Sequence, residues 1–275
     1  MRIVTVTTDF GLQDWFVGVM KGVVLSRAAQ VELVDLTHLI EPGNVRQAAF
    51  VLKNAVRWFP PGTVHLAVVD PGVGSDRRPI AVRTDWGYLV GPDNGLFSYV
   101  LEEAGSFQAR RIANPGPMMS EVSRTFHGRD VFAPAAAHLA GGGDFEALGP
   151  IVADPVCFPW PRIESWPEGR GGEVVYIDRF GNLITNLPNE LLRGVGSDAS
   201  LRLPSDAAPL IPVGRRYADA PEGALIGVPG STGYIEIAVH RGNAARRLGL
   251  KIGAPVWLHL PNQSASAEGR SGSAS

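Results

Sequence analysis

A glycine-rich loop in the first half of the chain brings acidic and basic side chains close together in the sequence. Asp70 follows an apolar run, and Arg77 and Arg78 come after the segment Pro-Gly-Val-Gly-Ser-Asp. A carboxylate and a guanidinium at the two ends of such a loop can hold a water molecule or an anion between them. The same residues also suit a surface turn with an ion pair. Spacing alone leaves both interpretations open.

A histidine motif lies further along the chain. His127 stands in the string Phe-His-Gly-Arg-Asp, directly before an alanine-rich helical pattern that Asp130 could cap. An imidazole titrates near neutral pH and can accept or donate a proton during a reaction. The alternative is a loop histidine whose hydrogen bonds are satisfied locally, with Asp130 acting only as a helix cap.

Turn segments in the second half offer groups that suit a nucleoside or an amino acid. Residues 178–182, Asp-Arg-Phe-Gly-Asn, form a predicted hairpin turn because Gly and Asn tolerate positive φ. They also combine a carboxylate, an aromatic ring and an amide, a set suited to an ammonium group and a purine. Residues 229–234 and 240–245 are similar: each is a turn by default, and a ligand loop if the segments converge.

Several common chemistries lack their motifs. The loop after Asp70 lacks the third glycine of a dinucleotide-binding fingerprint, and the sequence has neither a Walker lysine motif nor His-Glu-x-x-His. A formal net charge of -2 argues against nucleic acid as a partner. The single cysteine, Cys157, excludes an intramolecular disulfide and a thiolate metal site, and we expect it to be buried.

The elements that must position these side chains alternate between strand and helix in the first half. The predicted strands cover residues 2–8, 31–36 and 64–69. Helical patterns begin near Asp14, a candidate N-cap, and near Asn44. This alternation predicts an N-terminal α/β domain with a central, mostly parallel sheet.

Acidic residues lie at the carboxyl ends of successive predicted strands. They are Asp9, Asp35, Asp70 and Asp93. In open α/β sheets, ligands bind outside the carboxyl ends of the strands. We therefore expect one cleft to hold several of these side chains.

The composition divides the chain into two domains. We predict the α/β domain over residues 1–155, an extended Pro- and Gly-rich linker over 156–172, and a smaller C-terminal all-β barrel over 173–262. Residues 263–275 form a predicted disordered tail. The sequence has neither a signal-peptide pattern nor an apolar run long enough to span a bilayer. We expect a cytoplasmic protein with no membrane partner.

Six motifs, in this order, carry a resemblance to one family. They are Thr8-Asp9-Phe10-Gly11, Asp70-Pro71-Gly72-Val73-Gly74, Gly91-Pro92-Asp93-Asn94-Gly95, Phe126-His127-Gly128-Arg129-Asp130, Phe180-Gly181-Asn182 with Thr185-Asn186, and Gly242-Asn243-Ala244-Ala245. Over roughly residues 3–260 the chain resembles the S-adenosylmethionine (SAM) hydroxide adenosyltransferases, relatives of the fluorinase and the chlorinase.

The resemblance implies an enzyme that hydrolyses SAM to adenosine and methionine by in-line attack of water on ribose C5′. Asp70, Arg77 and His127 would orient and polarise the water, and Arg78 is the alternative to Arg77. The sulfonium is already a good leaving group, so no acid is needed on that side. SAM is the substrate, and neither a metal nor a cofactor is implied.

The resemblance also assigns substrate contacts in both domains. They are Asp9 for the ribose hydroxyls, Asp14 and Asp178 for the methionine ammonium, Phe180 and Asn182 for the adenine, Ser231 for the methionine carboxylate, and the backbone around Ala244 for the adenine edge. Family members resemble one another in forming trimers with sites between subunits, so the resemblance implies a homotrimer.

Three other functions stay open. A halide could replace water as in the halogenases, but the Asp70 carboxylate would repel an incoming anion, and the long insertion of the fluorinase is absent between Arg78 and Gly91. A metal-dependent hydrolase could use Asp9, Asp70 and His127 as ligands. A non-catalytic sensor could bind an adenosyl ligand without turnover.

Overall fold

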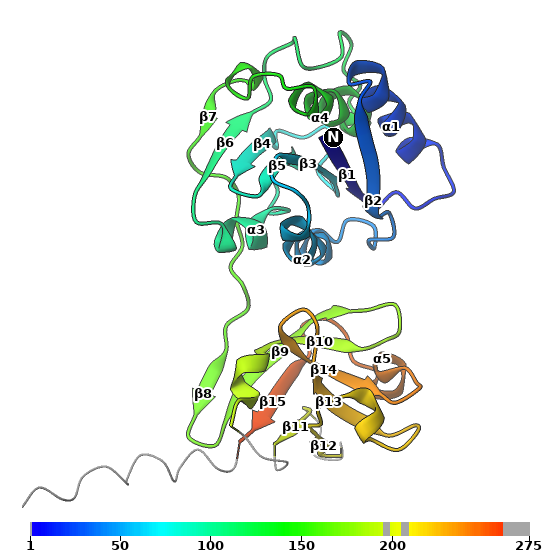
Figure 1. The fold of residues 1–275 in the computed structure, drawn as a ribbon, viewed down its shortest axis with the longest axis vertical. Helices are drawn as coiled ribbons and strands as arrows, with labels where there is room; N and C mark the ends of the chain where they lie inside the picture. Colours follow the sequence, from blue (N-terminus) through cyan, green and yellow to red (C-terminus); the bar gives the residue numbers. More distant parts are fainter. Residues whose placement is uncertain (1, 195–198, 205–208, 261–275) are drawn as a thin grey trace, which may run out of the picture. The chain divides into compact units, whose positions relative to one another are not determined.

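The computed structural model describes residues 2–194, 199–204 and 209–260 (Figure 1). The chain divides into two compact units between Pro159 and Trp160. We refer to them as the N-terminal and C-terminal units. The predicted disordered tail, residues 263–275, lies outside the described residues.

The N-terminal unit is built on a mixed sheet. Its strands are β1 (Arg2–Thr8), β2 (Val31–Thr37), β3 (Thr63–Val68), β4 (Pro79–Thr84), β5 (Gly87–Pro92), β6 (Phe107–Arg111) and β7 (Ile151–Val152). Among the described residues they pair in the order β2-β1-β3-β5-β4-β6-β7. The first four strands in this order are parallel, whereas β4, β6 and β7 join by antiparallel pairing.

The α/β class is therefore confirmed, but the prediction of a mostly parallel sheet is corrected to a mixed one. The reason lies in the connection from β4 to β5. Only Asp85 and Trp86 separate these two strands, so they form a tight hairpin. A parallel pair would have required a long crossover.

Helices cover both faces of this sheet (Figure 1). The helices are α1 (Phe16–Arg27), α2 (Val45–Ala55), α3 (Ser98–Glu103) and α4 (Ala133–Ala140), with short helical turns η1 (Val56–Trp58), η2 (Gly128–Phe132) and η3 (Glu146–Leu148). Each face of the sheet has its own hydrophobic core, and successive residues of β3 point into opposite cores. Leu66 belongs to the same core as Met20 of α1, and Ala67 to the same core as Leu52 of α2. Burial on both faces fits the largely apolar sequence of β3, whose six residues are all buried.

The two predicted helix starts have different outcomes. The predicted start near Asn44 is confirmed, and the Asn44 side chain also caps α2 by accepting a hydrogen bond from the backbone N–H of Gln47 at 3.0 Å. The prediction for Asp14 is wrong, since α1 begins at Phe16 and its N-cap residue is Trp15. Asp14 lies in an exposed bend before the helix.

The C-terminal unit is a nearly closed antiparallel barrel. Its elements are β8 (Glu164–Trp166), β9 (Gly169–Ile177), β10 (Leu183–Pro188), η4 (Asn189–Leu192), β11 (Ser200–Arg202), β12 (Ile211–Pro212), η5 (Tyr217–Asp219), β13 (Leu225–Pro229), β14 (Tyr234–Val239), α5 (Ala244–Leu248) and β15 (Pro255–His259). The sheet runs β12-β11-β15-β9-β10-β14-β13, and a bridge between Val213 and Gly227 links its two ends. The predicted β-barrel is confirmed.

The structure differs from the predicted linker over residues 156–172. β8 and the first part of β9 lie inside this range and pair with each other. A Cβ atom on Gly169 would lie 2.3 Å from the Leu258 carbonyl oxygen and 2.9 Å from the Trp166 ring. Glycine here permits close approach of strands and an indole, so its presence does not signal a flexible chain.

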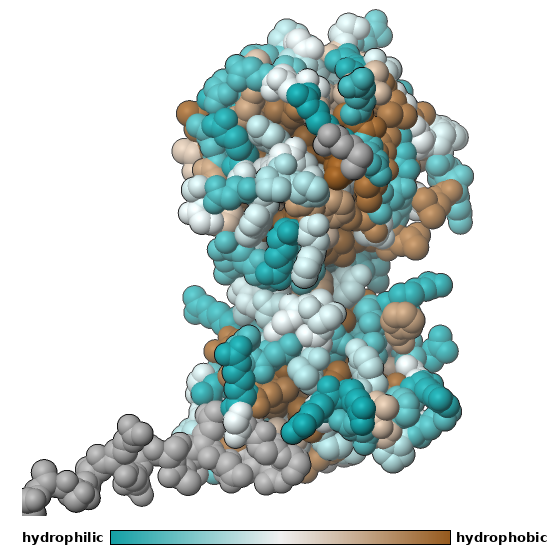
Figure 2. Space-filling view, in the orientation of Figure 1, coloured by the Kyte–Doolittle hydropathy of each residue, from teal (hydrophilic) through white to brown (hydrophobic). Residues whose placement is uncertain are grey.

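The surface is mixed in polarity. Figure 2 shows hydrophilic residues interspersed with smaller groups of apolar residues on both units. In the part of the chain that the structure describes, no helix has the length and apolar character needed to cross a membrane. Cys157, which we expected to be buried, is exposed, because it lies in an irregular segment before β8.

A buried histidine makes the stability of the N-terminal unit depend on pH. His65 on β3 is 1% exposed, and its Nδ1 lies 2.9 Å from the Thr5 hydroxyl. Burial lowers its pKa to about 4. The unfolded chain binds this proton near pH ~6.5 and the folded chain only near pH 4, so lowering the pH through this window favours unfolding by roughly 3 kcal/mol.

We predict that His65→Gln flattens this pH dependence. Urea unfolding of the wild-type protein and the variant at pH 7 and pH 4.5 measures it. The exposed His259 provides the matched control variant, His259→Gln. Equal pH dependence in the wild type and His65→Gln would contradict the assignment.

Candidate active site

The loop that carries Asp70 and Arg77 crosses the end of a strand. It leaves β3 and enters β4, while β5 lies between these two strands in the sheet. Asp9, Asp70 and Asp93 come just after the parallel, neighbouring strands β1, β3 and β5. These three acids therefore lie at one edge of the sheet, the edge where open α/β sheets bind ligands. That one cleft holds them stays a prediction.

Asp70 and Arg77 form a buried, multiply bonded ion pair. Arg77 Nε lies 3.0 Å from each carboxylate oxygen of Asp70, and Arg77 Nη2 also pairs with Oδ2. Only 9% of the Arg77 side chain and 4% of the Asp70 side chain are exposed. Charge-assisted bonds of this kind fix both position and orientation. The loop between the two residues is mostly exposed, but the ion pair at its ends is shielded from solvent.

His127 joins this pair through the arginine. Its Nδ1 lies 2.6 Å from Arg77 Nη2. A guanidinium only donates hydrogen bonds, so His127 Nδ1 must accept and the ring proton must reside on Nε2. The Arg77 side chain thus bridges a carboxylate and a neutral imidazole.

Local structure around His127 explains how it reaches Arg77. His127 immediately precedes η2, a π-helical turn that leads into α4. Gly74, in the middle of the Asp70 loop, has φ +80°, and a Cβ there would lie 2.5 Å from the carbonyl oxygen of Arg124. Only glycine allows this contact, which packs the loop against the segment that precedes His127.

The electrostatics favour the neutral form of His127. Burial lowers the pKa of this imidazole below its usual value, and the adjacent Arg77 cation lowers it further, against the opposing effect of Asp70 and Asp130. A proton on Nδ1 would turn a donor–acceptor pair into two facing donors. The geometry and the direction of the pKa shift therefore agree.

One nitrogen of the Arg77 guanidinium takes part in none of these hydrogen bonds. Arg77 Nη1 is buried and has no hydrogen-bond partner among the described residues. A buried donor without an acceptor is costly, and it marks a place where a water oxygen or an anion gains a strong hydrogen bond. The guanidinium carbon also lies 5.2 Å from the centre of the Phe132 ring, which limits where Nη1 can point.

Arg78 has different partners from Arg77. It bonds the buried carboxylate of Asp93 through Nε at 2.6 Å, and Asp154 through Nη1 at 2.8 Å. The structure therefore joins Arg77, and not Arg78, to Asp70 and His127. Sequence spacing could not separate the two adjacent arginines.

Asp130 and Asp35 are both held by cations outside the Asp70–Arg77–His127 set. Asp130 is buried, pairs with Arg129 and accepts a hydrogen bond from the backbone of Ser123 at 2.8 Å, so the helix-cap prediction is wrong. Asp35 pairs with Lys21 at 2.6 Å. Over the described ranges, no group of three or more His, Cys, Asp or Glu side chains could hold a metal ion.

Asp9 is held in place by a backbone contact that the sequence did not reveal. One of its oxygens, Oδ2, accepts a hydrogen bond from the Gly43 N–H at 2.7 Å. The turn after Asp9 is anchored through the N–H of Gly11, which donates to the carbonyl of His38 at 2.8 Å. A carboxylate accepts several hydrogen bonds, so Asp9 keeps capacity for a ligand hydroxyl.

The predicted hairpin turn in the C-terminal unit is confirmed. Asp178 closes it by accepting hydrogen bonds from the backbone N–H groups of Phe180 at 2.9 Å and Asn182 at 2.8 Å, and from the Asn182 side chain at 2.9 Å. The Phe180 ring is 75% exposed. A large aromatic ring is thus presented outward from a tightly bonded turn.

The other two predicted contact residues lie on separate segments of this unit. Ala244 begins α5 and is buried, and the next residue, Ala245, donates its N–H to the Gly181 carbonyl at 2.9 Å. The turn at 178–182 and the start of α5 are therefore brought together. Ser231 is exposed in the turn between β13 and β14.

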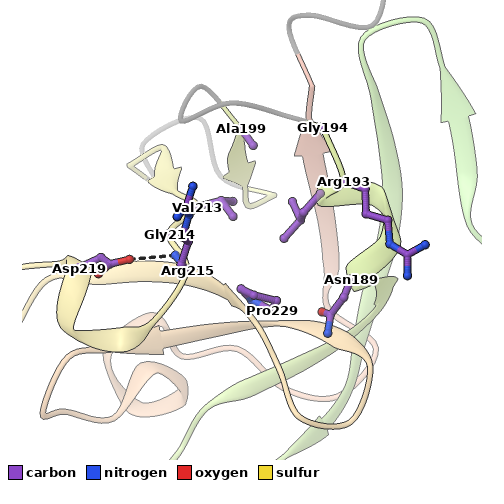
Figure 3. Close-up of a pocket in the computed structure, with 10 residues that line it drawn as sticks. Asn189, Arg193, Gly194, Ala199, Val213, Gly214, Arg215, Asp219 and Pro229 are labelled. Carbon is purple, nitrogen blue, oxygen red and sulfur yellow. Dashed lines mark hydrogen bonds between the residues drawn. The ribbon is translucent and has the colours of Figure 1, made fainter.

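A cavity of about 780 Å³ lies elsewhere in the barrel (Figure 3). It is lined on one side by Arg215, whose backbone N–H donates to Asp219 at 3.0 Å, and on another by Asn189. The residues drawn around it include none of the predicted site residues. This cavity has no catalytic arrangement comparable to the Asp70–Arg77–His127 set.

Comparison with known proteins matches both units to one family. The model of the SAM hydroxide adenosyltransferase N-terminal domain matches residues 4–149, and that of the C-terminal domain matches residues 172–257. The chain belongs to the SAM hydroxide adenosyltransferase family. The family predicted from the sequence motifs is confirmed.

Members and relatives of this family align over nearly the whole chain. A protein of Thermus thermophilus named (R)-S-adenosyl-L-methionine hydrolase is 43% identical over 94% of this chain and 100% of its own length. A fluorinase of Actinopolyspora mzabensis is more distant, at 30% identity over 92% of this chain and 96% of its own. The crystal structure of an uncharacterized conserved protein from Thermotoga maritima, 37% identical, superposes with a TM-score of 0.87 over 93% of this chain and 99% of that one.

We predict that His127 titrates with a pKa below ~6.5 and that its Nδ1 is unprotonated at neutral pH. The Arg77 cation and burial both oppose protonation. Nitrogen-15 NMR of the imidazole as a function of pH measures both properties. Arg77→Ala should raise this pKa, with Arg83→Ala, a partly exposed arginine on β4, as the control. A protonated Nδ1 at neutral pH would contradict the hydrogen-bond assignment.

Proposed function

We propose that this protein hydrolyses S-adenosyl-L-methionine to adenosine and L-methionine. The observation that carries the proposal is the buried Arg77 guanidinium, fixed between Asp70 and His127, whose Nη1 has no partner among the described residues. Two relatives of this chain, at 43% and 40% identity, carry the name (R)-S-adenosyl-L-methionine hydrolase. We therefore extend the proposal to the R epimer at sulfur as the preferred substrate.

In the proposed reaction, Arg77 Nη1 donates a hydrogen bond to the oxygen of the attacking water. A nearby cation stabilises hydroxide character in a water whose pKa in bulk is ~15.7. Asp70 accepts the proton, because the lone pair of His127 Nδ1 is already directed at Arg77. His127 therefore holds the guanidinium in place and does not itself take the proton.

The bond changes balance without any further reactant. The water oxygen forms a bond to ribose C5′, the C5′–S bond breaks, and its electron pair neutralises the sulfonium to give the thioether of methionine. Asp70 passes the proton to solvent. Holding water in line with C5′ and sulfur supplies on the order of 7–11 kcal/mol of the barrier reduction. We propose that no metal and no cofactor takes part.

Substrate contacts are proposed on both units. On the N-terminal unit, Asp9 binds the ribose hydroxyls with the capacity left beside its Gly43 contact, and the exposed Asp14 contacts the ammonium. On the C-terminal unit the proposed contacts are Asp178 for the ammonium, Phe180 and Asn182 for the adenine, Ser231 for the carboxylate and the backbone at Ala244 for the adenine edge. The exposed ring of Phe180 is suited to stacking.

We further propose a cytoplasmic homotrimer with sites between subunits. This proposal rests on the resemblance of the sequence motifs to a family whose members form trimers with sites between subunits.

The proposed function predicts adenosine and methionine in equal amounts from SAM. The assay separates products by chromatography, with the S and R sulfonium epimers supplied separately, and repeats the reaction in ¹⁸O-labelled water. Label in the 5′-hydroxyl of adenosine is expected, because water attacks C5′. EDTA should leave the rate unchanged, and added chloride or fluoride should give no 5′-halogenated nucleoside.

Each competing function gives a different result in this assay. Loss of activity in EDTA, restored by a divalent ion, would support a metal-dependent hydrolase. A 5′-halogenated product would support halide transfer, and binding without adenosine formation would leave a sensor.

Two variants separate nucleophile handling from substrate binding. Arg77→Ala should lower kcat by about 100- to 1,000-fold with little change in KM, because the guanidinium acts on the water and its charge. Asp9→Ala should instead raise KM by about 10- to 100-fold, the cost of losing charged hydrogen bonds to the ribose. Steady-state kinetics with Arg83→Ala as the control measures both, and an unchanged KM in Asp9→Ala would refute the ribose assignment.

A further inference from the structure

The loop from Val69 to Arg78 spans two strands that are not neighbours. It connects β3 to β4, and β5 lies between them in the sheet. The chain must therefore pass over the carboxyl end of β5. The residues just beyond β5, Asp93 and Asn94, are placed beneath this crossing by topology.

Asn94 fixes the first end of the loop. Its side-chain Nδ2 donates to the carbonyl oxygen of Val69 at 2.9 Å, and Val69 directly precedes Asp70. Its Oδ1 accepts the backbone N–H of Leu96 at 3.2 Å, which orients the amide. The backbone that leads into Asp70 is thus tied to the end of β5.

Asp93 fixes the second end. Its backbone N–H donates to the Arg78 carbonyl at 2.9 Å, which adds one more bond to the β4–β5 ladder beyond the Pro79–Pro92 pair. Its carboxylate Oδ2 accepts from Arg78 Nε at 2.6 Å, and Oδ1 accepts from the Val156 N–H at 2.7 Å. The Asp93 side chain is 1% exposed, so this ion pair is shielded from solvent on its acidic side.

We propose that Asp93, Asn94 and Arg78 are positioning residues that clamp the two ends of the Asp70–Arg77 loop and thereby hold Arg77 between Asp70 and His127. This role rests on the proposed hydrolysis. None of the five hydrogen bonds described here involves a group assigned to the water or the substrate. The clamp also explains why an arginine stands directly beside Arg77: Arg78 anchors the loop and Arg77 serves the nucleophile.

The two partners of Arg78 differ in what they contribute. Asp154 is 84% exposed at its side chain, whereas Asp93 is buried. Exposed ion pairs contribute little, and a buried carboxylate that loses its partner is destabilising. The structure therefore assigns the clamp to the Asp93–Arg78 pair, and Asp154 provides a matched control on the same guanidinium.

The test compares Asp93→Asn, Arg78→Gln and Asn94→Ala with the control Asp154→Asn. A small displacement of Arg77 costs catalysis more than binding, so we expect kcat for SAM hydrolysis to fall about 10- to 100-fold in the first three variants, with KM within about threefold. The control should keep kcat within about twofold of the wild type. The double variant Asp93→Asn with Arg78→Gln should be no slower than the slower single variant, because each substitution removes the same Asp93–Arg78 ion pair.

A second readout does not depend on turnover. NMR titration of His127 reports whether Arg77 still contacts its Nδ1, so the pKa of His127 should move toward its ordinary value in Asp93→Asn and Arg78→Gln and stay unchanged in Asp154→Asn. A purely structural loss of stability would not move the pKa of the folded protein. If Asp93→Asn does not fold, Arg78→Gln alters the partly exposed member of the pair and gives the same test.

Wild-type kinetics and an unchanged His127 titration in both Asp93→Asn and Arg78→Gln would overturn the clamp. Failure of the proposed function gives a different result, because the wild-type protein itself would then form no adenosine. The pKa of His127 in the variants would still show whether the clamp holds Arg77 in place.

Discussion

The buried guanidinium of Arg77 is the constraint on which the rest of the N-terminal unit depends. A cation that is 9% exposed must be compensated by a partner, and Asp70 provides it through both carboxylate oxygens. Because a guanidinium only donates, the remaining neighbour, His127, must be neutral and must accept through Nδ1. One charge requirement therefore sets the protonation state of the whole set.

Sheet topology decides where this set can stand. The loop that holds Asp70 and Arg77 crosses the end of β5 because β5 lies between β3 and β4. This crossing brings Asp93 and Asn94 against both ends of the loop, and Gly74 allows it to contact the segment before His127. The mixed sheet is thus the reason for this geometry, since the β4–β5 hairpin creates the crossing.

The C-terminal unit contributes rigid turns on a barrel. Asp178 accepts hydrogen bonds from Phe180 and Asn182, and the turn packs against the start of α5 through Gly181. A turn stabilised by its own side chains presents the exposed Phe180 ring at low entropic cost. This preorganisation suits the recognition of a flat base and an ammonium group in the proposed reaction.

The sequence by itself determined the α/β and β-barrel classes, because apolar periodicity and turn residues act locally, and its motifs identified the family. It placed the start of α2 near Asn44, but it wrongly suggested Asp14 and Asp130 as helix caps. It read residues 156–172 as a linker, because glycine has the same composition signal whether it gives flexibility or close packing. Only the tertiary structure distinguished the partners of Arg77 from those of Arg78. It also buried the Asp70 carboxylate against Arg77 and fixed the tautomer of His127. Those outcomes depend on which strands are neighbours and which atoms lose water, and sequence spacing contains neither.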